Sequence, residues 1–193
     1  MTQTSVKLET YRTGFDALLQ EAEATDPQWL TDLRREAWSR FYKLGFPTAR
    51  RGNEKWKYTS VRPLAAANFD NPVVIGFPEN INAAALRLVA PWNDAWTNLV
   101  FLDGHFTGYL SNLQNGAGQI TVTNLADAIA SGNPDVQIQL AKHANIDDDG
   151  FTALNTAFLR DGAFVNVPAG HIAARSEELP GGEEGKSRWA RHP

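Results

Sequence analysis

The chain has 193 residues, of which 42% are hydrophobic and 21% are charged, a composition typical of one folded domain or of a small domain with an extension. Its 18 Lys and Arg against 22 Asp and Glu give a net charge of −4, which argues against a general nucleic-acid binder. The absence of Cys excludes disulfides, thiolate catalysis and metal sites ligated by thiolates from this chain.

An amphipathic helix is predicted over residues 27–44. Its apolar residues recur at steps of three and four, which places them on one helix face: Leu30, Leu33, Ala37, Phe41 and Leu44. We expect Asp26 at the N-cap position, Pro27 in the first turn and Gly45 as the C-terminal stop.

A shorter helix is predicted before it, over residues 10–24. Phe15, Leu18 and Leu19 would face the longer helix, so that the two form a helical hairpin across Thr25 and Asp26. Three arginines of the longer helix are expected to fall largely off its apolar face: Arg34, Arg35 and Arg40.

The middle of the chain changes pattern twice. Prolines and glycines interrupt residues 45–78, which predicts an irregular segment that wraps over other elements. From Leu86 to Ala90 the apolar residues alternate, which favours a strand, and Asp103-Gly104 between two apolar runs predicts a hairpin. Asn115-Gly116 then precedes a further strand, and we expect these strands to form an antiparallel meander.

Helices are predicted again over residues 124–130, 135–144 and 151–159, the last with Asp149 as its cap. After Gly162, a short strand over residues 163–167 is expected to end at Pro168. Residues 171–193 hold few large apolar side chains, four acidic and four basic residues, three Gly and two Pro, so we expect a disordered tail. The predicted fold class is therefore α+β.

Three motifs resemble the SufB/SufD family of the SUF iron–sulfur cluster assembly system. They are LGFPTARRGNEKWKYTSVRPL at residues 44–64, LVFLDGHF at 99–106 and FTALNTAFLRDGAFVNVPAG at 151–170. The motifs come in the order that the family has them, and the resemblance covers residues 25–170. The run from Glu54 to Thr59 favours the SufD branch of the family over SufB.

The resemblance implies an amino-terminal helical and mixed region, then a long right-handed parallel β-helix, then helices that dock the ATPase SufC. Residues 1–162 would be the amino-terminal region and residues 163–170 the start of the β-helix, with the rest of the β-helix missing and residues 171–193 an atypical tail. One solenoid strand cannot bury its apolar face without neighbouring coils. We therefore expect an exposed β-helix edge at Phe164, Val165 and Val167.

By the same resemblance, the function is that of a non-catalytic scaffold subunit of the SufBCD complex, not of an enzyme. The partners of an intact member would be SufB-like and SufC-like subunits, and we expect binding to both to be impaired in this truncated chain. The iron–sulfur cluster would be handled by the complex, and we expect no cofactor, catalytic residue or metal ligand in this chain. No nucleic acid and no membrane partner is expected.

The segment from Arg50 to Arg62 is a possible interaction patch, because it holds five basic residues and one acidic residue around two aromatic rings. Its candidate residues are Arg50, Arg51, Lys55, Trp56, Lys57 and Tyr58. They could dock an acidic protein surface or stack on nucleic-acid bases. Alternatively, Trp56 and Tyr58 fasten an irregular segment to the helical hairpin while the lysines remain solvated.

Other polar residues point to structural roles. Asp147, Asp148 and Asp149 lack the alternating ligands and the terminal glutamate of a calcium loop, and fit a helix amino terminus better. His105 beside Asp103 could contribute to a weak metal site, but a polar residue flanking a turn explains it as well. No nucleophile motif or phosphate-binding loop is present.

Two other functions remain open on the sequence. One is an unrelated α+β enzyme or ligand-binding domain with a site around Trp56, Tyr58, Asp103 and His105; the other is a non-functional truncated product. The amino terminus lacks the apolar core of a signal peptide, and no apolar run approaches the roughly 18 residues of a membrane span. We therefore expect a cytoplasmic location.

Overall fold

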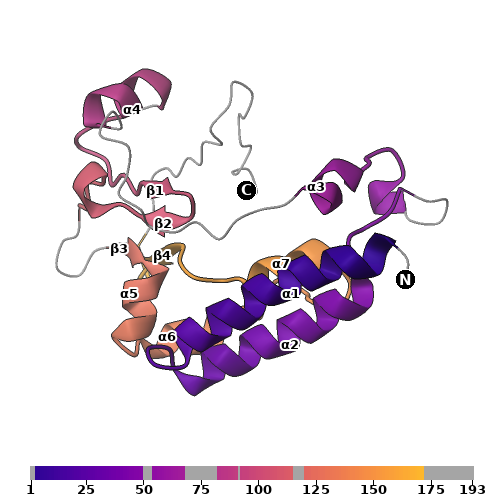
Figure 1. Cartoon of the computed structure of the whole chain (residues 1–193). Helices are drawn as coiled ribbons and strands as arrows, with labels where there is room; N and C mark the ends of the chain where they lie inside the picture. Colours follow the sequence, from indigo (N-terminus) through magenta and orange to yellow (C-terminus); the bar gives the residue numbers. More distant parts are fainter. Residues whose placement is uncertain (1–2, 50–53, 68–81, 91, 115–119, 172–193) are drawn as a thin grey trace. The chain divides into compact units, whose positions relative to one another are not determined.

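The computed structural model describes residues 3–49, 54–67, 82–90, 92–114 and 120–171 (Figure 1). Helices and short antiparallel strands make up this part of the chain, so the expected α+β class is confirmed. The chain divides into two compact units: Met1–Pro72 with Ala126–Arg160, and Val73–Leu125 with Asp161–Pro193. The tail predicted to be disordered lies, from residue 172 on, outside the described residues.

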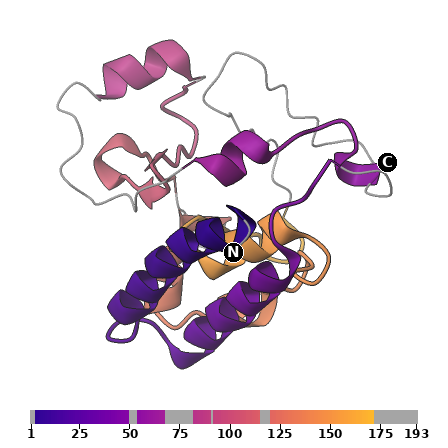
Figure 2. The same cartoon turned by 45° about the vertical axis from the view of Figure 1, so that its right-hand side comes forward.

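The first unit is built on the predicted helical hairpin. Helix α1 covers Gln3–Ala22 and helix α2 covers Gln28–Leu44, and the two run side by side in Figures 1 and 2. The ring of Phe15 stacks on that of Trp38 with centroids 4.7 Å apart, and Leu18 is buried beside them. The apolar faces that the sequence predicts therefore meet as expected.

Two details of α2 differ from the prediction. The helix begins at Gln28 with Pro27 at the N-cap position, so Asp26 does not cap it. The Asp26 carboxylate instead pairs with Arg34. This arginine was expected off the apolar face of α2 but is only 2% exposed. Leu44, expected on the buried face, is exposed because it lies at the end of the helix next to Gly45.

Helix α7, Gly150–Ala157, packs along α2 (Figure 2). The two helices meet where Gly150 touches the chain at Gly45, and a Cβ at position 150 would lie 2.0 Å from the Gly45 carbonyl oxygen. Gly45 has a φ of 65° and donates its N–H to the Phe41 carbonyl, so it ends α2 as predicted. The absence of a side chain at Gly150 therefore sets how closely α7 approaches α2.

Aromatic rings extend the core of the first unit from α1 to the segment after α2. Phe41 contacts Phe46 with centroids 5.2 Å apart, Phe46 contacts Phe151 at 5.7 Å, and Phe151 contacts Trp56 at 5.4 Å. Edge-on and tilted ring pairs of this kind add to the stability that burial provides. The series connects the helical hairpin with α7 and with residues 54–56.

The remaining helices of the first unit are short. They are η1 (Glu54–Trp56), α3 (Arg62–Ala66), α5 (Leu125–Ala130, whose first residue belongs to the second unit) and α6 (Pro134–Gln139). The segment expected to be irregular from residue 45 on thus contains helical turns at η1 and α3, and much of it lies outside the described residues. The helix predicted to run to residue 144 ends at Gln139, because Leu140 is extended and Ala141 has a φ of 60°.

In the second unit, the prediction of a strand around Leu86 is wrong. Residues Ala83–Val89 form helix α4, and the Asn82 side chain caps it by accepting the N–H of Ala85 at 3.0 Å. The cap and the three alanines in the first turn favour a helix over the strand that the alternation of Leu86, Leu88 and Ala90 indicated.

The Asp103-Gly104 hairpin is confirmed. Strand β1, Phe101–Leu102, pairs antiparallel with β2, His105–Phe106, and the helical turn η2 follows at Gly108–Leu110. Asp103 and Gly104 have φ values of 48° and 81°, the pair of positive angles that a tight two-residue hairpin turn requires.

The predicted meander is wrong. Strand β3, Thr121–Asn124, pairs with β4, Ala163–Asn166, and not with the β1–β2 hairpin. The pairing is antiparallel, with Val122 opposite Val165 and Asn124 opposite Ala163. The predicted strand over residues 163–167 exists, but its described partner comes from about forty residues earlier in the chain. Of the described helices, none is long and apolar enough to span a membrane.

Candidate interaction surfaces

Apolar side chains are exposed on strand β4 and at the residue that follows it. Val165 is 52% exposed and Val167 is 44% exposed, while Phe164 is half-buried. Within the described part of the chain, β4 has only β3 as a hydrogen-bonded neighbour. No charged residue lies between Ala163 and Val167 to discourage pairing with a further strand. This strand is therefore a candidate interaction surface.

The carboxylate of Asp161 fixes the start of this strand within the second unit. Its Oδ2 accepts the N–H of Phe106 at 3.2 Å, and its Oδ1 accepts the N–H of Gly162 at 2.8 Å. The buried Asn124 side chain donates to the same carboxylate at 3.4 and 3.5 Å, and the Leu125 N–H donates to the Gly162 carbonyl at 2.7 Å. Asp161 thus ties β2 to the β3–β4 pair.

The second candidate surface, the strap, is the segment Glu54–Val61. The Lys55 ammonium forms an ion pair with Asp149 at the start of α7, and Trp56 rests against Phe151. Lys57 lies 3.4 Å from Glu54.

Tyr58 is 91% exposed, so it does not fasten the segment to the helical hairpin. Lys55 and Lys57 of the proposed patch both have acidic partners inside the first unit. Trp56 packs on α7 instead of on the hairpin. Arg50 and Arg51 lie outside the described residues.

Asp149 serves two elements at once. Its Oδ1 accepts the N–H groups of Phe151 and Thr152 at 2.9 and 3.1 Å, which confirms it as the cap of α7. The hydrogen bond from Lys55 is the main reason that the pKa of Asp149 lies below its ordinary value of 3.8, and the two backbone donors act in the same direction against burial. The charged form of this side chain is therefore favoured.

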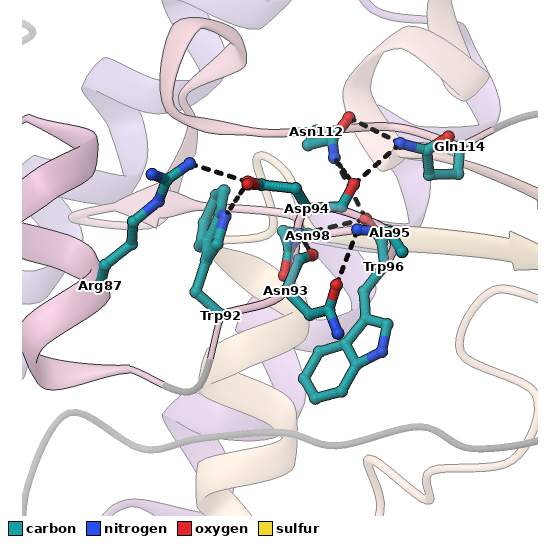
Figure 3. A network of polar contacts seen from close by, with 9 residues as sticks. All are labelled: Arg87, Trp92, Asn93, Asp94, Ala95, Trp96, Asn98, Asn112 and Gln114. Carbon is teal, nitrogen blue, oxygen red and sulfur yellow. Dashed lines mark hydrogen bonds and ion pairs between the residues drawn. The ribbon is translucent and has the colours of Figure 1, made fainter.

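A polar network that the sequence analysis did not identify organises the loop before β1 (Figure 3). The Asp94 carboxylate accepts from Arg87 at 2.7 Å and from the indole N–H of Trp92 at 2.8 Å. The side chains of Asn112 and Gln114 both donate to the Asp94 carbonyl, at 2.8 and 3.2 Å. The only sequence signal for this network is the frequent Asn, Asp and Gln near Trp92 and Trp96.

The other candidate residues do not form a site of their own within the described residues. Asp147 pairs with Arg40 at 2.7 Å and Asp148 accepts from Asn145 at 2.7 Å, so this acidic run is engaged locally. The described part of the chain contains no group of three or more His, Asp and Glu placed to hold a metal ion. Asp103 and His105 belong to the second unit, whereas Trp56 and Tyr58 of the alternative enzyme site belong to the first.

Comparison with known proteins adds one match. The family model for the SufBD protein N-terminal region matches residues 6–176. No curated protein and no solved structure is significantly similar to the chain. The match includes the two candidate surfaces described above, the strap and β4.

Proposed function

Because this chain belongs to the SufBD family through its match to the family's N-terminal region, we propose that it is a non-catalytic scaffold subunit of the SufD type in iron–sulfur cluster assembly. The observation that carries the proposal is the extent of the match, which covers most of the 193 residues. The motif from Glu54 to Thr59 supports the SufD branch over SufB.

In this role the cluster is cargo of the complex and not a resident cofactor of this chain. The absence of Cys supports that assignment, because thiolates are the usual protein ligands of such clusters. The residues that we assign to the role form surfaces instead of a catalytic centre. They are Val165 of strand β4 with Val167 just after it, and the strap.

We propose that β4 contacts a SufB-like subunit, more weakly than an intact family member would. An apolar strand edge without charged residues can add a strand from another protein, and the backbone hydrogen bonds then provide the affinity.

Site-specific cross-linking tests this assignment. A photo-reactive residue at Val165 in the full chain should capture a SufB-like subunit from the source cells, whereas the same residue at Ile138, an exposed position on α6, should not. Capture from both positions, or from neither, would contradict the proposed contact.

A further inference from the structure

We propose that the strap, Glu54–Val61, is a conformational device whose attachment to α7 is controlled by the ion pair between Lys55 and Asp149. This inference does not depend on the proposed function, since it concerns only contacts inside the first unit. The released form would free the already exposed Lys55 ammonium from its partner and expose the Trp56 indole beside the exposed Tyr58 ring.

Among the described residues, the strap meets α7 and its cap through an ion pair and a ring contact. One is the ion pair from Lys55 to Asp149, and the other is the ring contact of Trp56 with Phe151, with centroids 5.4 Å apart. The backbone hydrogen bonds near these residues are local, with the Thr59 N–H donating to the Trp56 carbonyl at 3.1 Å. Detachment therefore breaks few interactions, as is typical of segments that open locally.

The far end of the strap stays anchored. Val61 is buried, and its carbonyl accepts the N–H of Ala65 at the start of α3. Release at Lys55 and Trp56 is then a hinged movement of the described segment instead of an unfolding of the unit. The α7 cap also survives, because Asp149 keeps its hydrogen bonds from Phe151 and Thr152 when Lys55 leaves.

The geometry favours release of the strap by competing ions or charged groups, and not by ordinary changes of pH. The Lys55 side chain is 69% exposed and the Asp149 side chain 13%, so solvent ions or a competing carboxylate reach the pair from the lysine side. The charged neighbours of the pair along the chain are Glu54, which pairs with Lys57, Asp147, which pairs with Arg40, and Asp148, which accepts a hydrogen bond from Asn145. The hydrogen bond from Lys55 holds the pKa of Asp149 below its ordinary 3.8, so the carboxylate is charged at neutral pH and small changes around neutral pH do not release the strap.

The test uses the natural absence of Cys. Two nitroxide labels on introduced cysteines, Tyr58→Cys on the strap and Asn155→Cys on α7, report their separation by pulsed electron paramagnetic resonance. Both positions are exposed. A Trp56→Ala version of the labelled protein, which lacks the ring contact, provides the distance distribution of a loosened strap.

We expect Lys55→Gln to raise the ratio of long to short distances by up to about fivefold, the range set by exposed ion pairs. Asp149→Asn, which keeps a capping side chain, should have the same effect, and the double variant should add nothing further. Lys57→Gln is the matched control, because it removes an equal charge whose partner, Glu54, lies on the strap itself.

Two results would overturn the proposal. One is a distance distribution in Lys55→Gln that equals that of the unsubstituted labelled protein at low and high salt. The other is an opening in Lys57→Gln as large as in Lys55→Gln, since net charge and not the specific pair would then be responsible. If Asp149→Asn lowers the helical circular dichroism signal, the comparison of the two lysine variants decides alone.

Discussion

The guanidinium of Arg34 donates two hydrogen bonds to the carbonyl of Leu159, from Nε at 2.9 Å and from Nη2 at 2.7 Å, across 125 residues of sequence. Its third nitrogen binds the Asp26 carboxylate. The arginine thus joins the α1–α2 connection, the middle of α2 and the chain just after α7. This buried contact holds the family's third motif against the helical hairpin.

Arg34→Ala should lower the free energy of unfolding by about 3 kcal/mol, because it leaves the Leu159 carbonyl and the Asp26 carboxylate without their donor. Arg35→Ala is the control, since Arg35 lies on the exposed side of the same helix with only surface ion pairs. It should change the free energy by less than about 0.5 kcal/mol. Urea denaturation measures the free energy of unfolding of both variants. Equal losses would show that the Arg34 contacts stabilise the fold no more than those of Arg35.

Gly150→Ala should destabilise the first unit, since the new Cβ would lie 2.0 Å from the backbone oxygen of Gly45. Backbone cannot rotate away as a side chain can, so α7 must shift from α2, at a cost of about 1–3 kcal/mol. Gly108→Ala serves as the comparison, because its Cβ would meet only the Phe106 ring at an ordinary 3.5 Å. Thermal unfolding followed by circular dichroism should show a lower midpoint for Gly150→Ala, and an unchanged midpoint would contradict the close packing.

The stability of the first unit should fall in acid partly through Asp149. Its pKa in the folded protein lies below the ordinary 3.8, so its contribution is complete above that pH and is lost as the pH falls through the lower folded value. Asp149→Asn keeps a cap but cannot titrate. The free energy of unfolding, measured against pH below 3.8, should therefore fall less steeply in the variant. Parallel curves for the two proteins would show that the pKa of Asp149 is the same folded and unfolded.

A lysine on the exposed strand should reduce association between chains. Val165→Lys places a charge on the edge, which discourages strand pairing, and costs little stability because Val165 is half exposed. Ile138→Lys adds the same charge to an exposed aliphatic position on α6. Light scattering during concentration should show less self-association for Val165→Lys only. A similar decrease in both variants would attribute the effect to net charge.

Local sequence rules predicted the elements whose signals are local. The apolar spacing of α2, the stop at Gly45, the Asp149 cap and the Asp103-Gly104 turn all depend on residues within a few positions of one another. Helix ends differed from the prediction where the backbone angles terminate the helix, as at Ala141 after α6. At residues 83–89 the Asn82 cap outweighed the alternating pattern.

Long-range contacts could not be predicted in this way. The partner of β3 is β4, about forty residues later, and a sequence period does not encode which distant strand completes a pair. Arg34 was expected off the apolar face of α2, and its burial is explained by distant and local partners, the Leu159 carbonyl and the Asp26 carboxylate. Likewise, the pairing of Lys55 with Asp149 and the Asp94 network depend on the folded chain.

The activity of iron–sulfur enzymes in cells that lack this chain tests most directly whether it supports iron–sulfur cluster assembly. We expect deletion of the coding sequence to lower the activity of such enzymes under iron limitation without lowering their protein amounts. The 193-residue chain should restore the activity, and its Arg34→Ala variant should restore less. Unchanged enzyme activity in the deletion strain under iron limitation would contradict this role.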